Sequence, residues 1–143
     1  MKIRSFVESD QDAVIRLWQA CGLTRPWNDP VADIRRKLQV QRELFVVGVV
    51  DGAIVASAMA GYDGHRGWVN YLGVHPEHQR KGYGEAIMRC VEQGLLALGC
   101  PKINLQMRSA NQLARNFYDA IGYAEDDTIC YGKRLIPDQA PDR

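Results

Sequence analysis

The sequence predicts an α/β domain with a mixed central sheet, and three observations carry this prediction. Two apolar runs rich in β-branched residues, 44–50 and 53–60, are joined by Asp51-Gly52, which is a strong signal for a tight antiparallel hairpin. A strand over 68–74 is followed by a helical pattern and then by an alternating stretch, which indicates a parallel right-handed crossover. The expected order along the chain is β-α-α-β-β-β-α-β-α-β.

The N-terminal part is expected to form one strand and two helices. Residues 3–6 suit a short strand. Ser9 can cap a first helix that Gly22 ends, and Asp29 can cap a second helix with Pro30 at its first position. Apolar residues at helical spacing predict a buried stripe on each helix: Val14, Leu17, Trp18 and Cys21 on the first, and Val31, Ile34 and Leu38 on the second.

The C-terminal half is expected to hold two more helices and two more strands. Residues 103–107 alternate between apolar and polar and predict a strand. Ser109, with Gln112 three residues later, forms a capping-box pattern for the last helix. A final strand is expected over 128–135, and the polar tail from Pro137 is expected to fray. The long helix before Gly99 and Pro101 has one apolar side, made of Tyr83, Ile87, Val91, Leu95 and Leu98.

Composition places the chain among ordinary globular proteins of one domain. Its 143 residues, 46% hydrophobic and 24% charged, can bury a sizeable core, and no linker divides residues 1–143. A formal net charge of +1 argues against nucleic acid as a partner. No apolar run suits a membrane span or a leader, so a cytoplasmic location is expected. The cysteines form no CxxC pair and are expected to be reduced and buried: Cys21, Cys90, Cys100 and Cys130.

Residues 79–84, Gln-Arg-Lys-Gly-Tyr-Gly, lie between an expected strand and an expected helix and predict a phosphate-binding turn. The first N–H groups of a helix have no partner within it, and the helix dipole favours an anion there. Gly82 and Gly84 allow the backbone to approach closely, while Arg80 and Lys81 add positive charge. The alternative is a surface turn with two basic residues, but the flanking strand and amphipathic helix favour the phosphate site.

Two other phosphate-binding motifs are excluded by what is missing. A Rossmann fingerprint needs a small residue where Ile87 stands, and a Walker loop needs Gly-Lys followed by Ser or Thr. The turn instead resembles the Q/R-x-x-G-x-G/A pyrophosphate loop of the GNAT N-acetyltransferase family. Asn111 and Tyr118, followed by Ile121-Gly122-Tyr123, resemble the second motif of that family, and the order of elements agrees along nearly the whole chain.

The resemblance implies the GNAT fold, in which helices flank both faces of a mixed sheet, and acetyl-CoA as co-substrate without a metal. Residues 24–30 and 61–67 are most similar to the small bacterial YpeA-type branch. By resemblance, backbone groups of Leu72 and Val74 hold the acetyl-pantetheine arm, and the Leu72 N–H polarises the thioester carbonyl. The turn residues that would hold the pyrophosphate are Gln79, Arg80, Lys81, Gly82, Tyr83 and Gly84.

The two polar residues of the second motif each have a structural alternative. Asn111 would contact the pantetheine arm, or it starts the last helix. Tyr118 would protonate the departing CoA thiolate, because a phenol is neutral at working pH and can still donate a proton. A tyrosine packed on the core face of the helix is the alternative.

The general base is where the sequence departs from the family pattern. Several GNAT enzymes carry Glu on the strand before the last helix, but Gln106 occupies that position, and an amide cannot accept the proton of the amine. Ordered water leading to Asp63 or His65 is the predicted route, with a plain turn role as the alternative for both. His75 and His78 have no third ligand nearby in the sequence, which argues against a metal site.

The acceptor site is expected to be walled by Trp27 and Tyr62, since loop aromatics recognise ligands with little loss of entropy. A half-buried Trp that covers the corner of two helices is the alternative. Basic residues of the second helix are expected to be a solvated face that an acidic acceptor could also use: Arg35, Arg36, Lys37 and Arg42.

The sequence therefore predicts transfer of acetyl from acetyl-CoA to a primary amine, on a small molecule or peptide, by direct attack in a ternary complex. The competing interpretation is a CoA-binding or sensing module without chemistry, which Gln106 favours and Tyr118 opposes. A structural interaction domain leaves the glycine turn unexplained. The identity of the acceptor and the oligomeric state, with a homodimer as one option, stay open.

Overall fold

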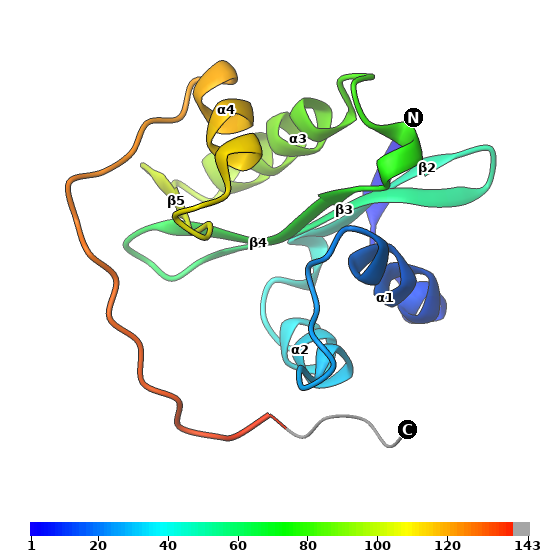
Figure 1. The fold of residues 1–143 in the computed structure, drawn as a ribbon, viewed down its shortest axis with the longest axis horizontal. Helices are drawn as coiled ribbons and strands as arrows, with labels where there is room; N and C mark the ends of the chain where they lie inside the picture. The colour runs from blue at the N-terminus through cyan, green and yellow to red at the C-terminus, as the bar shows by residue number, and fades with distance from the viewer. Residues whose placement is uncertain (139–143) are drawn as a thin grey trace.

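A computed structural model describes residues 1–138, and the five strands in this part of the chain form one sheet (Figure 1). The strands are β1 (Lys2–Ser5), β2 (Phe45–Val50), β3 (Ala53–Tyr62), β4 (Gly67–Val74) and β5 (Ile103–Leu105). They lie in the order β1-β2-β3-β4-β5, antiparallel as far as β4, with β4 and β5 parallel. The mixed sheet predicted from the hairpin and the crossover is confirmed.

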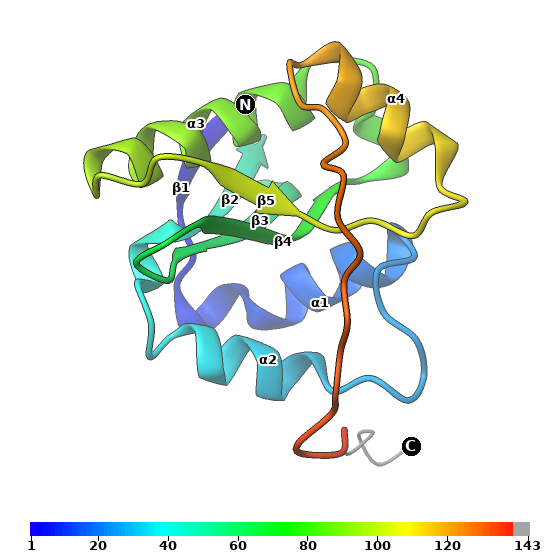
Figure 2. The same cartoon turned by 90° about the vertical axis from the view of Figure 1, so that its left-hand side faces the viewer.

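Helices cover both faces of the sheet. They are α1 (Gln11–Ala20), α2 (Pro30–Lys37), α3 (Tyr83–Ala97) and α4 (Gln112–Ala120), with short 3-10 turns η1 (Glu8–Asp10), η2 (Arg42–Leu44) and η3 (Pro76–His78). Figure 2 shows α1 and α2 below the sheet and α3 and α4 above it. No helix within residues 1–138 is long and apolar enough to cross a membrane.

Each face of the sheet has its own core, and β3 contributes alternate residues to the two. Ala56, Ala58 and Ala60 pack beneath α3, where their small size lets the helix lie close to the strand. The opposite core is formed mainly by α1, α2 and β2, and its buried Trp18 donates its indole N–H to Ser57 Oγ at 2.9 Å. The sheet is therefore buried on both faces, and alternate residues of β3 contribute to the two cores.

A β-bulge interrupts β4 in its second half. Asn70 lies opposite Met59 and Gly73 lies opposite Ser57, so two residues of β4 face one residue of β3. Tyr71 takes the left-handed conformation there, with φ of 53°, which is unfavourable for a residue other than glycine. The bulge shifts the alternation of side chains by one residue, because Val69 and Leu72 pack in the α3 core while Tyr71 packs in the α1/α2 core.

Two helix starts differ from the sequence prediction. The residue before α1 is the buried Asp10, not Ser9, and its carboxylate accepts hydrogen bonds from the Val7 N–H and the Arg4 guanidinium. Asn111, not Ser109, caps α4, since its Oδ1 accepts from the Ala114 N–H at 3.1 Å. For α4, the side chain that accepts from a free helix N–H lies two residues later than expected, whereas Asp10 makes no capping hydrogen bond to α1.

The prediction of a final strand over 128–135 is wrong. These residues are extended but form no strand, and the segment swings away from the sheet (Figure 1). A strand needs a hydrogen-bonded neighbour as well as an alternating sequence, and none is supplied here within residues 1–138. Cys130 lies in this segment and is exposed, which corrects its expected burial. Of the tail predicted to fray, residues 139–143 lie outside the described part of the chain, and Asp138 accepts from Arg134 at 3.1 Å.

Candidate active site

The parallel pair β4 and β5 separates halfway along β4. Pairing is limited to three positions, Gly67 with Ile103, Trp68 with Asn104 and Val69 with Leu105. Beyond Val69, β4 continues as far as Val74 beside β3 alone, while the chain leaves β5 for α4. The second half of β4 therefore presents backbone groups toward the gap that β5 has left, as the edge of a sheet does.

The predicted phosphate turn follows this open part of β4 after the short turn η3. Gly82 begins α3 with φ of 80°, and no side chain caps this helix within the described residues. Arg80 also has positive φ, 64°, and the side chain of Gln79 ties the turn to β4 by donating to Val74 O at 3.2 Å. The turn thus lies at the positive end of a 15-residue helix.

Gly84 is required by packing rather than by backbone conformation. A Cβ at this position would lie 3.1 Å from the ring of Phe117 on α4. The second glycine of the motif therefore brings α4 close to the start of α3. This contact places the motif around residue 118 beside the phosphate turn, although the two are far apart in the sequence.

Tyr118 lies on the face of α4 that is turned toward the α3 core. Its ring meets Phe117 and Tyr123 edge to face, with centroids 5.0 and 5.6 Å away. Burial raises the pKa of Tyr118 to about 12. The phenol is therefore protonated at any physiological pH. Position and packing fit both a proton donor and the structural alternative.

Asn111, Leu72 and Val74 have structural roles that coexist with the implied ones. The Asn111 side chain caps α4, so the helix-start alternative describes it at least in part. The side chains of Leu72 and Val74 pack against the α3 core. Their backbone groups remain the part of each residue that could meet a ligand in the open half of β4.

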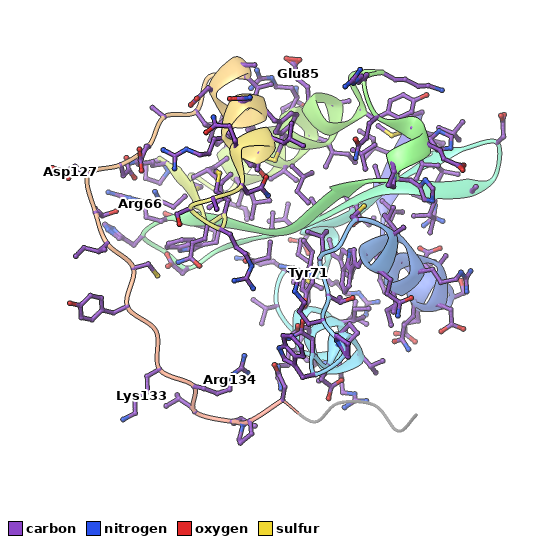
Figure 3. The ribbon with its side chains drawn as sticks, viewed as in Figure 1. Arg66, Tyr71, Glu85, Asp127, Lys133 and Arg134 are labelled. Atoms are coloured by element: carbon purple, nitrogen blue, oxygen red, sulfur yellow. The ribbon has the colours of Figure 1, made fainter. Side chains whose placement is uncertain are left out.

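Tyr71 and Asp33 are site neighbours that the sequence reasoning missed. Tyr71, labelled in Figure 3, lies at the bulge. It stacks on Trp18 with centroids 3.9 Å apart and donates its hydroxyl to Asp33 Oδ2 at 2.6 Å. Burial, followed by the hydrogen bond to Asp33, raises the pKa of Tyr71. The sequence does hold a sign of the bulge. Apolar residues alternate at Val69 and Tyr71, but the next one is Leu72 and not residue 73, and such a break in the alternation indicates a bulge.

The loop that carries Trp27 borders the open half of β4. It starts where Cys21 Sγ donates to Val74 O at 3.3 Å, and it ends in α2, whose Asp33 holds Tyr71. Trp27 is 64% exposed in this loop. An exposed Trp does not cover a helix corner, so the structural alternative for this residue loses support.

Tyr62 is not brought to Trp27. It continues the alternation of Ala56, Ala58 and Ala60 and packs with the α3 core, on the opposite face of the sheet from α1 and α2. Its hydroxyl donates to Gly64 O at 3.2 Å within the turn between β3 and β4. A single aromatic wall built from both residues, as the sequence suggested, is not what the fold forms.

Asp63 and His65 lie in the same turn, beyond the paired part of β4 and β5. The Asp63 carboxylate accepts from the N–H groups of His65 and Arg66 at 2.8 and 2.7 Å, and from Trp68 Nε1 at 3.2 Å. These hydrogen bonds, those to the two backbone N–H groups first, lower the pKa of Asp63. The contacts are those of a turn residue, and the paired residues 67–69 separate this turn from the open half of β4.

Gln106 lies just past the end of β5 and faces the C-terminal segment. Its amide donates to Cys130 Sγ at 2.6 Å. A cavity of about 1220 Å³ runs along the outer side of β5, and Gln106 and Tyr118 both line it. None of residues 79–84 of the phosphate turn lines this cavity.

No group of three His, Cys, Asp or Glu side chains within residues 1–138 is arranged to hold a metal ion. His75 and His78 flank η3, and the His75 imidazole accepts from the Glu77 N–H. The groups at this site that could contact a ligand include backbone N–H groups, one helix N-terminus and a buried phenol.

Comparison with known proteins agrees with this geometry. The model of the acetyltransferase (GNAT) family matches residues 3–123. An acetyltransferase of Yersinia enterocolitica is 51% identical over 97% of this chain and 99% of its own length. One of Pectobacterium atrosepticum is 49% identical over the same shares.

Solved structures show the same fold. Ard1 of Thermoplasma volcanium superposes with a TM-score of 0.78 at 25% identity, covering 86% of this chain and 82% of its own. The aminoglycoside N-acetyltransferase AAC(6')-Iy, bound to the bisubstrate analogue CoA-S-monomethyl-acetylneamine, gives 0.76 at 18% identity, covering 94% and 98%. With a family model that spans most of its length and relatives about half identical to it, the chain belongs to the GNAT family and is an acetyltransferase.

Proposed function

We propose that the protein transfers the acetyl group of acetyl-CoA to a primary amine by direct attack within a ternary complex. One observation carries the proposal: the open half of β4 leads, through the short turn η3, into the phosphate turn at the start of α3. A pantetheine arm needs an extended partner with free amide groups, and a pyrophosphate needs a helix N-terminus. Both are present in the right order.

The turn is assigned to the pyrophosphate. Backbone N–H groups near Gly82, Tyr83 and Gly84 would donate to its oxygens, and the exposed Arg80 and Lys81 would add positive charge. Gln79 fixes the turn through Val74. Asn111 is assigned to the pantetheine arm, beside its capping of α4.

Leu72 is assigned to the thioester carbonyl. It follows the strained Tyr71 in the bulge, where β5 no longer pairs with β4. A bulge aims backbone groups out of the regular ladder, so the Leu72 N–H can polarise the carbonyl oxygen as negative charge develops on it. Tyr71, held by Trp18 and Asp33, keeps that strained conformation in place.

Tyr118 is assigned as the general acid. The neutral amine forms a bond from nitrogen to the carbonyl carbon, the carbon–sulfur bond breaks, and the thiolate takes the phenolic proton. The amine nitrogen loses one proton to water, and solvent returns a proton to the phenolate. A phenol with a pKa of about 12 is still protonated when the carbon–sulfur bond breaks, so its proton is available to the leaving thiolate.

The route of the amine proton is assigned to ordered water, because Gln106 cannot accept it. Asp63 and His65 remain the predicted ends of that route. The full set of hydrogen bonds on Asp63 disfavours it, since accepting a proton there would break bonds that stabilise the turn. This leaves water that reaches bulk solvent as the simplest acceptor.

The test is release of free CoA thiol from acetyl-CoA in the presence of a panel of amines, amino acids, polyamines and peptides with free N-termini. Amine-dependent release supports the proposal. Tight binding of acetyl-CoA by calorimetry, with no release above the solvent rate for any acceptor, is the result expected of a CoA-binding module without chemistry.

A further inference from the structure

Tyr71 is held at three points in a strained conformation. Its ring stacks on Trp18 with centroids 3.9 Å and planes 10° apart. Its carbonyl oxygen accepts from Ser57 Oγ at 3.2 Å, and that hydroxyl in turn accepts from the Trp18 indole. Its own hydroxyl donates to Asp33 Oδ2 at 2.6 Å. These contacts impose a φ of 53° on a tyrosine, and residues kept in such conformations cluster at functional sites.

A second pair of the same chemistry serves as an internal comparison. The Tyr123 hydroxyl donates to Glu92 Oε2, also at 2.6 Å. Tyr123 does not have a positive φ, and its ring packs beside Tyr118 in the α3 core. A hydroxyl–carboxylate contact therefore forms in this protein without backbone strain, so the contact alone does not account for the strain at Tyr71.

Tyr71 lies on the face of the sheet that a bound CoA leaves free. The phosphate turn begins α3, and Figure 2 shows α3 on the opposite side of the sheet from α1 and α2. CoA held at this turn, with its arm along the open half of β4, occupies the α3 side and brings the thioester beside Leu72. An amine that attacks directly has to approach from the other side. Tyr71 adjoins Leu72 in the bulge, and its side chain packs on the α1/α2 side.

The hydroxyl oxygen of Tyr71 is able to accept a hydrogen bond. A phenolic hydroxyl has one proton and two lone pairs on its oxygen. The proton is engaged by Asp33, and no group within residues 1–138 donates to the oxygen. Asp33 itself is 35% exposed, and its other oxygen accepts from Arg36 at 3.2 Å. A proton that reaches this carboxylate can therefore pass to solvent.

We propose that Tyr71 is a second catalytic residue, which takes the proton of the attacking amine while Asp33 positions its hydroxyl and receives the hydroxyl proton. This inference rests on the proposed function. As the bond from nitrogen to the carbonyl carbon forms, one N–H proton moves to Tyr71 Oη and the hydroxyl proton moves to Asp33 Oδ2. Asp33 then loses this proton to water, and the tyrosine turns its new hydroxyl proton back to the carboxylate. The nitrogen thus sheds the positive charge that it gains in the attack.

This relay supplies the function that Gln106 cannot perform. The proton still ends in water, but it leaves the nitrogen along a path fixed by the fold. Asp63 has its carboxylate occupied by three donors, whereas the Tyr71 oxygen keeps its lone pairs available. A carboxylate on α2, acting through a tyrosine of β4, replaces the Glu expected on the strand before the last helix.

The first test compares Tyr71→Phe with Tyr123→Phe, using an amine that the wild type acetylates. Each change removes one hydroxyl that donates to a carboxylate at 2.6 Å and keeps the ring. Tyr71→Phe should lower kcat by about 10²-fold or more, with the acceptor KM and the acetyl-CoA dissociation constant nearly unchanged. Tyr123→Phe should keep the wild-type kcat. Wild-type kcat in Tyr71→Phe where chemistry limits turnover, or an equal loss in both variants, would overturn the relay.

The second test separates a proton acceptor from a structural partner. Asp33→Asn keeps an oxygen that can accept the hydrogen bond of Tyr71 but cannot take its proton. It should lower kcat, and the double variant with Tyr71→Phe should be no slower than Tyr71→Phe alone, because Asp33 acts only through that hydroxyl. Glu92→Gln, the matched change in the other pair, should keep the wild-type kcat.

The outcomes distinguish the relay from the reaction itself. Losses that multiply in the double variant would contradict the relay and leave the acetyl transfer standing. A folded wild type that binds acetyl-CoA but releases no thiol with any amine would contradict the proposed function, and the relay with it.

Discussion

The two ends of the proposed substrate path are built from different material. At the acetyl-CoA end, the contacts come from backbone: the open half of β4, the bulge at Tyr71 and the turn at Gly82. At the acceptor end, the proposed contacts come from side chains on loops, such as Trp27. A common co-substrate can be held by conformation alone, whereas a particular acceptor has to be recognised by particular side chains.

This difference explains why one end could be assigned from spacing and the other could not. Glycines, a strand and a helix start determine where backbone N–H groups point. Side chains on loops have no such periodicity. Tyr62 and Trp27 looked equivalent in the sequence, yet strand parity puts Tyr62 on the α3 face and the fold keeps Trp27 on the other.

The largest expected effect is on the chemical step at the acetyl-CoA end, where the proposed general acid is a side chain. Tyr118→Phe removes only the hydroxyl and should lower kcat by about 10²- to 10⁴-fold, with the dissociation constant of acetyl-CoA nearly unchanged. Steady-state kinetics under conditions where chemistry limits turnover, together with calorimetry, measure both. Tyr123→Phe is the matched control, because that hydroxyl bonds Glu92 instead. Wild-type kcat in the Tyr118 variant would make Tyr118 a packing residue only.

Gly82→Val should weaken acetyl-CoA binding about tenfold or more, which corresponds to about 1.4 kcal/mol, while the fold persists. A β-branched side chain at φ of 80° strains the turn and moves its N–H groups. Gly99→Val is the control, since Gly99 has φ of 84° and equally open surroundings at the other end of α3. Equal affinities in the two folded variants would remove the pyrophosphate from this turn.

The Arg4–Asp10 pair belongs to neither end of the proposed substrate path, and its loss should affect the stability of the whole fold. Asp10 is 7% exposed, and the hydrogen bond from Arg4 is the largest cause that lowers its pKa below 3.8. A depressed carboxyl pKa stabilises the fold above about pH 4, and the contribution is lost as pH falls through the folded-state pKa. Asp10→Asn should reduce the free energy of unfolding at pH 7 by about 1–2 kcal/mol.

Chemical denaturation of the Asp10 variant at several pH values checks this expectation. The difference in the free energy of unfolding between wild type and Asp10→Asn should become smaller from pH 5 toward pH 2. A gap that stays constant with pH would mean that the carboxylate charge contributes nothing.

Trp27→Ala should have the smallest effect and the one most specific to the acceptor end. It should raise the KM of the acceptor a few-fold, in line with about 1 kcal/mol for one aromatic contact, and leave the KM of acetyl-CoA unchanged. Val40→Ala, which is also exposed on the α1/α2 side, should change neither. Equal changes in both KM values would return Trp27 to a structural role.

The fold was predictable wherever local signals and pairing agreed. Asp51-Gly52, the crossover and the helical stripes give the sheet order and the two layers. The only sign of the bulge in the sequence is a break in the apolar alternation at Tyr71-Leu72. The hydrogen bond of Tyr71 to Asp33 joins residues 38 apart, which no local sequence pattern links. The prediction of a strand over 128–135 was wrong because an alternating sequence shows which side chains share a face, but not whether a neighbouring strand is there to pair with.

The most direct test of the backbone-built site is hydrogen exchange of individual amides with and without CoA. The account predicts that CoA protects the amides of residues 82–85 and of Leu72 and Val74, while those of the turn at Asp63 and His65 are unchanged. Protection confined to the cavity beyond β5, or binding without any protection at residues 82–85, would contradict it.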